Sequence, residues 1–422
     1  MNILVINHYA GSHTHGMDLR PFCLSRHWCN LGHDVTVVAA SYSHLRVRQP
    51  CLETGTSEER IEGIRYVWLK APRYRGNGPG RVWNLFAFLR RLRRSRKQIL
   101  RNWRPDVVIA ASTYLLDVYP ARRIARDSKA ALILEVRDLW PMTPIEIGGM
   151  SKWHPFMLLL QRAEKYAYRT ADRVVSTLPE ANRHMQRLGM APEKFAFVPN
   201  GIDVEAWEAR QEPLPGEHAR TLRALRRQGR FILGYAGAHG VSNALGTLVE
   251  AARLLQPRPV SVALVGQGPE KPALMEQARG LDPSSIVFLP AVGRAAVPAF
   301  LAAADAAYLG WKRRPIYQYG ISPTKLLDYM MAGKPVVHSV EAGNDPVAEA
   351  GCGLSCAAED PQAVAGAVVT LMSMTPQDRA ELGRRGQDYV RSRHDYALLA
   401  RNYLDVMGEA TTSGTRSTVA CT

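Results

Sequence analysis

The segment FILGYAGAHGVSNALGTLVEAARLL, residues 231–255, decides the class of fold. Its first six residues form a short apolar run, which is typical of a buried strand. Its last eleven residues repeat apolar side chains at helical spacing. The loop between them contains Gly237 and Gly240, which let the backbone approach a phosphate closely. A buried strand, a glycine loop and a helix in this order indicate one unit of a parallel α/β sheet.

The same order recurs through both halves of the chain. Apolar runs at 3–7, 34–40, 64–69, 106–111, 131–136 and 173–178 alternate with helical stretches, and further runs follow at 260–266, 285–290, 306–310 and 335–340. We therefore expect an α/β fold of two doubly wound, Rossmann-like domains that face each other across a cleft. The Pro- and Gly-rich stretch at 198–216 marks the connection.

These patterns place the domain boundaries. The expected division is an N-terminal Rossmann-like domain at 1–205, a second Rossmann-like domain at 206–385, a C-terminal helix at 386–410 and a disordered tail at 411–422. The helix is long and apolar enough on one side to pack back on the first domain. The chain of 422 residues, with 46% hydrophobic and 22% charged residues, fits this globular organisation.

Composition also restricts the location of the protein. A strand at the second residue leaves no room for a signal peptide, and the apolar runs are too short to span a membrane. The six cysteines show no spacing typical of a metal site or a disulfide framework. We expect reduced thiols and a cytoplasmic protein. They are Cys23, Cys29, Cys51, Cys352, Cys356 and Cys421.

The net charge of +16 favours acidic partners, and its densest block is the stretch 82–103. Apolar residues at helical spacing alternate there with arginines, so we expect a basic amphipathic helix. Such a helix can rest on an anionic membrane surface, or it can pack on the first domain with a solvated arginine face, and both can hold together. Nucleic-acid binding is disfavoured because the charge lies on one helix without a recognised docking motif.

Polar residues in the first half follow the expected strands. The loop at 7–16 holds three histidines and the glycines of a backbone approach, but its spacing does not fit a dinucleotide site. A metal site at His8, His13 and His15 is disfavoured because the loop offers no carboxylate, and ordinary polar contacts are expected. The candidate ligand-binding residues of the first half are Gly11, His15, Gly16, Thr177 and Glu180, and the catalytic candidates are Arg137 and Asp138.

Simpler explanations exist for some of these residues. Arg137 and Asp138 can form a surface ion pair, and Glu180 can simply stabilise the start of a helix.

The second half repeats this placement of polar residues and glycines after strands. The stretch YQYGISPTKLLDYMMAGKPVV, residues 317–337, puts Lys325 and Asp328 three residues apart on a short helix. We expect Ser322 to cap this helix and Pro323 to occupy its first turn. The candidate ligand-binding residues of the second half are Gly237, Gly240, Asn243, Gly266, Gly268, Arg294, Ser322, Lys325, Leu326 and Asp328, and Lys325 is also a catalytic candidate.

The order of these motifs resembles the two-domain GT-B glycosyltransferases, in particular the retaining enzymes of family 4. Within that family the chain is similar to the WbuB-like branch of N-acetylfucosamine and related amino-sugar transferases. The stretches that carry this resemblance are YAGSHTHGMDLRP (9–21), AASYSHLR (39–46), EVRDLWPMTPIEIGGMSKWHP (135–155) and GISPTKLLDYMMAGKPVV (320–337).

The resemblance also exposes three departures. The family's two glutamates stand eight positions apart, and here Asp328 takes the second, ribose-binding place while Gly320 takes the first. An Arg and a Lys that neutralise the diphosphate in many relatives are replaced by Ala238 and Asn243. Lys325 is the first candidate to supply the cation instead, and Arg294, Arg313 and Arg314 are the alternatives. Arg137 replaces a histidine that often follows the fourth strand of the first domain.

The resemblance implies a metal-independent, retaining transfer of an N-acetylated amino sugar from a UDP-sugar. It makes 206–385 the nucleotide-sugar-binding domain, whose ligand-binding candidates are then donor-binding. It makes 1–205 the acceptor-side domain, whose ligand-binding candidates then lie on the acceptor or sugar side of the site. The implied acceptor is a polyprenyl-diphosphate-linked saccharide in O-antigen, capsule or exopolysaccharide assembly. The enzyme is then expected on the inner face of the cell membrane, held there by the basic helix, and without nucleic acid as a partner. The alternative is a UDP-N-acetylhexosamine 2-epimerase of the same architecture.

Overall fold

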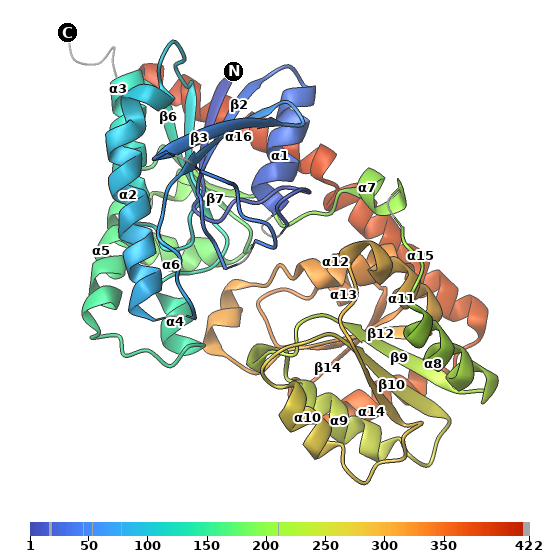
Figure 1. Ribbon diagram of the computed structural model, residues 1–422. Helices are drawn as coiled ribbons and strands as arrows, with labels where there is room; N and C mark the ends of the chain where they lie inside the picture. Colours follow the sequence, from blue (N-terminus) through green and yellow to red (C-terminus); the bar gives the residue numbers. More distant parts are fainter. Residues whose placement is uncertain (17–18, 45, 53, 77, 210, 417–422) are drawn as a thin grey trace. The chain divides into compact units, whose positions relative to one another are not determined.

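The computed structural model describes residues 1–422 except 17–18, 45, 53, 77, 210 and 417–422. The chain forms two compact units (Figure 1). The first comprises Met1–Asn200 and Tyr396–Thr422, and the second comprises Gly201–Asp395.

The first unit is built on an eight-stranded sheet with the order β3-β4-β2-β1-β5-β6-β7-β8. The strands pair in parallel except β3, which runs antiparallel to β4 and which the sequence pattern did not predict. Their bounds are β1 (Asn2–Ile6), β2 (Asp34–Ala40), β3 (Thr56–Ile61), β4 (Ile64–Leu69), β5 (Val107–Ala110), β6 (Ala131–Val136), β7 (Arg173–Ser176) and β8 (Phe195–Phe197).

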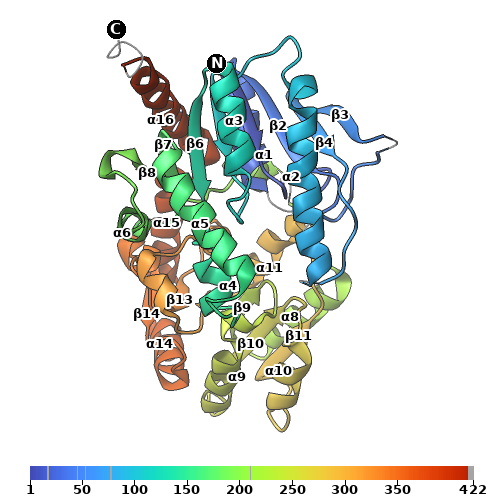
Figure 2. The same cartoon turned by 90° about the vertical axis from the view of Figure 1, so that its left-hand side faces the viewer.

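Helices cover both faces of this sheet (Figure 2). One face packs on α1 and α16 through a core that contains Phe22, Trp28 and Tyr403. On the other side, α2 and α5 share a smaller core around Leu85 and Leu160. The helices are α1 (Leu19–Asn30), α2 (Pro79–Ile99), α3 (Val118–Ser128), α4 (Met142–Glu146), α5 (Pro155–Thr170), α6 (Ala181–Arg187) and α16 (Tyr396–Arg416).

The second unit is a six-stranded parallel sheet with the order β11-β10-β9-β12-β13-β14. Separate apolar cores lie on its two faces, so the expected doubly wound architecture is confirmed for both units. Its strands are β9 (Phe231–Ala236), β10 (Val260–Val265), β11 (Ile286–Leu289), β12 (Ala306–Gly310), β13 (Val336–Ser339) and β14 (Gly353–Cys356).

The helices of the second unit follow its strands and complete the layers. They are α7 (Val204–Ala209), α8 (Gly216–Arg227), α9 (Leu245–Leu254), α10 (Lys271–Gln277), α11 (Val297–Ala303), α12 (Thr324–Met331), α13 (Pro346–Ala350), α14 (Pro361–Ser373) and α15 (Pro376–Arg393). Short 3-10 turns, among them η2 (Val241–Asn243), η3 (Arg294–Ala296) and η4 (Pro315–Tyr319), lie in the connecting loops.

Several boundaries differ from the expectation. The basic helix begins and ends earlier than 82–103, and Trp103 lies beyond it, where its indole N–H donates to Asp34 Oδ2 at 2.9 Å. The helix α16 continues to Arg416, past the point where a disordered tail was expected, and residues 417–422 lie outside the described part. Cys29, Cys51, Cys352 and Cys356 are free thiols, and Cys421 is outside the described residues.

Among the helices of the described ranges, none combines the length and the apolar character that crossing a bilayer requires.

Candidate functional site

Two loops of the second unit lie directly against each other at the carboxyl ends of β9 and β10. A Cβ on Gly266 would come within 1.9 Å of the Gly237 carbonyl oxygen, and a Cβ on Gly268 within 2.3 Å of the carbonyl oxygen of His239. These distances exclude any side chain. The amide of His239 donates to the Gln267 carbonyl at 2.8 Å and fixes the two loops together.

The ammonium group of Lys325 reaches these loops from the first turn of α12. Its Nζ donates to Tyr235 OH at 3.0 Å and to Asn243 Oδ1 at 2.6 Å, and it lies 5.0 Å from the centroid of the Tyr235 ring. A Cβ on Gly237 would lie only 2.6 Å from Lys325 Cδ, so the glycine makes room for the lysine stem. The lysine is therefore built into the loop and not merely close to it.

Lys325 lies beside the two positions, Ala238 and Asn243, at which the chain lacks the cations of the resembling family. Asn243 Nδ2 and the Tyr235 hydroxyl both donate to the Ala238 carbonyl, at 2.9 and 2.7 Å. These bonds hold in place the two side chains that accept hydrogen bonds from the ammonium group of Lys325. Burial lowers the pKa of Lys325 to about 8. A bound anion would stabilise the charged form of this amine, because it would replace the hydration that burial removes.

Asp328 lies one turn further along α12, and its side chain is 13% exposed. Burial raises the pKa of this carboxyl group to about 6, and the nearby Arg294 opposes the shift. Arg294 Nη2 approaches Asp328 Oδ1 at 3.4 Å, which is a loose contact from a side chain that is 60% exposed. The described partners of Lys325 and Asp328 are thus different residues, so the pair serves two separate positions.

Other candidates from the sequence have different places. Ser322 was predicted to cap α12, but the helix begins at Thr324 and Pro323 occupies the cap position without a side-chain cap. The side chain of Leu326 is buried in the apolar core of the unit, so only its backbone can lie near a ligand. Gly240 has room for a Cβ, since the nearest atom would be 3.6 Å away, so packing does not require glycine there.

Gly320, where relatives have an acidic residue, has a backbone reason to be glycine. Its φ is +96°, in the region that L-amino acids rarely adopt, at the end of η4. An acidic side chain at this position would therefore strain the turn. The backbone conformation between η4 and α12 therefore favours glycine over the glutamate of the family signature.

Three residues of this site were not singled out from the sequence. Tyr235 belongs to a buried strand and was interpreted as core, and Lys271 donates from α10 to the carbonyls of Gly266 and Leu289 at 3.0 and 3.1 Å. His239 is fully buried, and neither ring nitrogen has a hydrogen-bond partner among the described residues. Burial, together with Lys271 and Lys325, lowers the pKa of His239 to about 4, so the ring is neutral.

The catalytic candidates of the first unit follow β6. Arg137 is half-buried and Asp138 is exposed, and the Arg137 carbonyl accepts a hydrogen bond from Thr177 Oγ1 at 3.1 Å. Thr177 is fully buried and joins the ends of β6 and β7. Glu180 precedes α6 and pairs with Arg183 at 2.9 Å, so it acts locally at the start of that helix. The structure brings Arg137 and Thr177 together but not Glu180.

The loop after β1 closes on itself. The amide of Gly16 donates to Ser12 O at 2.7 Å with φ at +76°, and the Gly11 carbonyl accepts from Tyr66 OH at 2.8 Å. His15 is 6% exposed and its Nδ1 lies 2.9 Å from Ser12 Oγ. Burial lowers the pKa of His15. These three candidates therefore shape the loop, and the His15 ring packs inside it.

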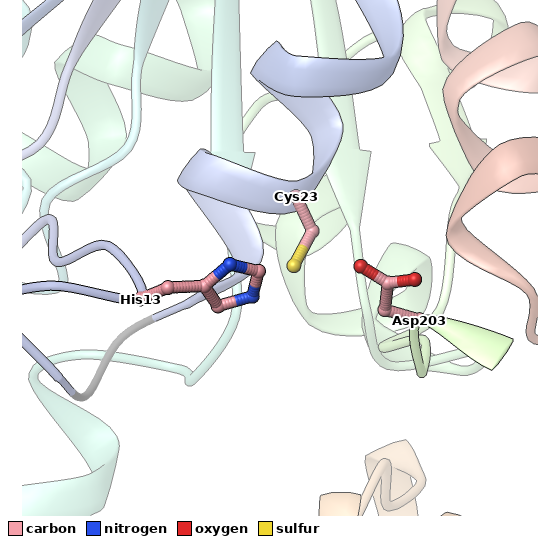
Figure 3. A group of neighbouring side chains, drawn as sticks. All are labelled: His13, Cys23 and Asp203. Carbon is pink, nitrogen blue, oxygen red and sulfur yellow. The ribbon is translucent and has the colours of Figure 1, made fainter. Parts of the chain in front are cut away.

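The other histidines of this loop make polar contacts, as expected. His8 is fully buried, with Nδ1 2.9 Å from Tyr114 OH and Nε2 2.7 Å from Asn84 Oδ1. Figure 3 shows His13 beside Cys23 of α1, and Asp203, in the same view, belongs to the second unit. No group of three candidate metal ligands lies within a single unit, as far as the described residues extend.

The arrangement in the second unit suits an anionic ligand that also carries hydroxyl groups. Lys325 offers a cation, the glycine loops offer close backbone approach, and Asp328 offers a carboxylate one helical turn away. Phosphates are held by such a cation and by amide dipoles, whereas a ribose diol is held by a carboxylate.

Comparison with known protein families assigns a description to each unit. Residues 16–201 match the glycosyl transferase 4-like domain, and residues 230–374 match the glycosyl transferases group 1 domain. The two matches fall in the first and the second unit, respectively, apart from residue 201 at the boundary.

Two curated relatives share part of their length with the chain. A protein named as colanic acid biosynthesis glycosyl transferase WcaI, from Escherichia coli, is 28% identical over 57% of this chain and 59% of its own length. A protein named as glycosyltransferase WbjE, from Pseudomonas aeruginosa, is 24% identical over 62% of this chain and 65% of its own length. The chain thus matches less than two thirds of either relative.

Solved structures share the whole fold. Sucrose-phosphate synthase from Thermosynechococcus elongatus aligns with a TM-score of 0.70 at 15% identity, covering 98% of this chain and 99% of the other. HepE from Anabaena, solved with UDP and glucose, aligns with a TM-score of 0.64 at 14% identity, covering 97% and 100%. The chain thus has the two-domain GT-B fold, and a glycosyl transferase domain description matches most of each of its two units.

Proposed function

We propose that the protein moves an N-acetylated amino sugar from a UDP-sugar to a polyprenyl-diphosphate-linked saccharide, with retention of anomeric configuration. The observation that carries this proposal is the pair of hydrogen bonds from Lys325 to Tyr235 and Asn243, one helical turn from Asp328. It offers a cation for a diphosphate and a carboxylate for a ribose within one short helix.

The similar proteins support the substrate classes of this proposal. HepE was solved with UDP and glucose, and WcaI is named for the biosynthesis of colanic acid, a polysaccharide. We place the chain in the WbuB-like branch because of the four sequence stretches that resemble it, and O-antigen, capsule or exopolysaccharide assembly follows from that placement.

The chemistry needs stabilisation of a departing diphosphate. As the bond between sugar and phosphate breaks, negative charge develops on the leaving group and positive charge on the sugar. Lys325 and the amides of the Gly237 to Gly240 loop neutralise the former, so the enzyme works without a metal ion, while Asp328 holds the ribose. Arg137 and Asp138 remain the catalytic candidates of the first unit, which binds the acceptor.

A panel of UDP-amino sugars with a polyprenyl-diphosphate acceptor tests the function through release of UDP. The Lys325→Ala variant should lose about 100-fold in kcat/KM, since one charge-assisted contact to the leaving group is worth about 2.7 kcal/mol in such sites. Lys334→Ala is the matched control, because Lys334 is also half-buried, follows the same helix and donates to the Ala302 carbonyl at 3.0 Å.

Two results contradict the proposal. Undiminished turnover of Lys325→Ala would remove the assigned role of the lysine. Conversion of a UDP-N-acetylhexosamine to its epimer without any acceptor would replace transfer by epimerisation.

We further propose that α2 holds the enzyme on the cytoplasmic face of the cell membrane. Its exposed side carries Arg90, Arg93, Arg94 and Lys97, which suit anionic lipid headgroups. Flotation with liposomes should require anionic lipid and fall when these four residues are changed to Gln. Flotation that ignores lipid charge, or that the four changes leave intact, would argue against this docking.

A further inference from the structure

A second cluster of cations lies in the first unit, at the loops that follow β2 and β4. The segments 41–52 and 70–81 contain no Asp or Glu in the sequence. Their basic residues are Arg46, Arg48, Lys70, Arg73, Arg75 and Arg81. Six positive charges without an acidic residue in the same loops indicate a surface that attracts anions.

The members of this cluster have different roles. Arg46 is buried, donates to the carbonyls of Ala10 and His8 at 2.8 and 3.1 Å, and lies over the ring of Trp68, so it holds the loop. Arg73 and Arg75 are exposed on either side of the buried Tyr74.

Tyr74 joins these arginines to α2. A Cβ on Gly80 would lie 3.2 Å from Tyr74 Cβ, so the first turn of α2 packs directly on this tyrosine. Arg81, the next residue, donates to Tyr9 OH from Nη2 at 3.2 Å and lies 5.6 Å from the centroid of that ring. The half-buried Arg81 and the two exposed arginines thus share one small region at the carboxyl ends of β1 and β4.

Apolar side chains continue from this region along α2. Trp83 is 64% exposed and Phe86 is 40% exposed, and both lie on the same helical stripe as Arg90, Arg93 and Lys97. Asn84 and Leu85, between them, are buried. The stripe therefore begins with aromatic residues and continues with basic ones. Helices with both kinds of residue bind at membrane interfaces.

We propose that Arg73, Arg75 and Arg81 bind the diphosphate of an isoprenoid-linked acceptor, whose hydrocarbon chain lies in an anionic bilayer at Trp83 and Phe86. The inference rests on the proposed function for the class of acceptor, and it assigns the acceptor to side chains within the first unit. Arginines suit this role because a guanidinium group contacts phosphate oxygens through two parallel N–H donors.

The diphosphate part is tested by titration calorimetry of the full-length protein with farnesyl diphosphate. Arg81→Gln and the double variant Arg73→Gln/Arg75→Gln should each weaken binding about tenfold or more, since hydrogen bonds to charged groups are lost. Arg126→Gln, an exposed change on α3 of the same unit, should leave binding unchanged. Arg73 and Arg75 are exposed, so we expect the double variant to fold. It therefore provides the test if Arg81→Gln misfolds.

Two related probes separate the sources of the phosphate. Farnesol should not bind, and inorganic pyrophosphate should bind more weakly than farnesyl diphosphate. Equal binding of pyrophosphate would reduce the cluster to a site for free phosphates, and equal binding of farnesyl diphosphate by the arginine variants and the wild type would overturn the inference.

The bilayer part is tested with vesicles of phosphatidylglycerol that carry brominated acyl chains, which quench tryptophan fluorescence. Trp83→Phe should remove a large share of the quenching, whereas Trp103→Phe, at the indole bonded to Asp34, should not. Equal loss from both variants would overturn this part. UDP binding, which depends on Lys325, is measured in parallel, so failure of the acceptor site is distinguished from failure of the proposed function.

Discussion

At the scale of single residues, the burial of Lys325 is compensated by a phenol and an amide. Neither neutral group fully replaces the water that a charged amine loses, which is why its pKa falls to about 8. Binding of a diphosphate raises the pKa again, because an opposite charge then lies within reach. The lysine must be protonated before it can help to hold the phosphates.

This coupling predicts that UDP affinity depends on pH. Below about pH 8 the lysine of the free protein is charged and affinity should be constant; above it the free amine loses its proton and affinity should fall. One pH unit above that pKa, the dissociation constant should be about tenfold higher. Calorimetry between about pH 7 and pH 9 measures the change.

Lys325→Arg provides the control for this prediction, since a guanidinium group stays charged across the range. The variant should bind UDP with little dependence on pH. A wild-type curve with the same slope as the variant would assign the effect to another group.

At the scale of elements, α2 presents two unlike faces. Its inner face carries Asn84, whose side chain is 1% exposed. Asn84 Nδ2 donates to the Pro72 carbonyl at 2.6 Å. Asn84 Oδ1 also lies 2.7 Å from His8 Nε2, and burial lowers the pKa of that histidine to about 3. Trp83, the neighbouring residue, points to the exposed face.

The two faces predict opposite effects of two adjacent substitutions. Asn84→Ala should lower the free energy of unfolding by about 2 kcal/mol, because a buried imidazole loses its partner. Trp83→Ala should change the free energy of unfolding by less than about 0.5 kcal/mol. Urea titration of both variants gives the comparison, and a Trp83→Ala loss as large as that of Asn84→Ala would contradict the orientation of the helix.

Strands and helices were largely predictable from the sequence, but the partners of the site were not. The apolar run at 231–236 is the strand β9, because burial on both faces gives a continuous apolar pattern. The same pattern hid Tyr235, whose hydroxyl group reaches past the end of the strand to Lys325. A residue that is core by its ring and polar at its tip has no distinct signal in the sequence.

Backbone geometry accounts for other differences. Gly320 was noticed as a missing acid, but its positive φ could not be known from one sequence. The start of α12 was placed too early because Ser322 resembles a capping residue, whereas the chain turns into the helix only after Pro323. The strand β3 carries charged residues at its exposed positions and so lacked the apolar run that would have predicted it.

At the scale of the whole molecule, the two units have separate cores, so each ligand should stabilise its own unit. Differential scanning calorimetry should show UDP raising the transition of the second unit, by about 2.7 kcal/mol of stabilisation at 100 times its dissociation constant. Lys325→Ala should remove this shift and leave the transition of the first unit unchanged. A single transition that UDP shifts as a whole would show that the units unfold together.

The packing of α16 on α1 has a consequence for synthesis of the protein. The core of the first unit includes Leu399, Tyr403 and Met407, and the indole of Trp28 donates to the Ala400 carbonyl at 3.0 Å. These residues leave the ribosome after the entire second unit. The sheet of the first unit is therefore synthesised early, but part of one face stays uncovered until α16 has been translated.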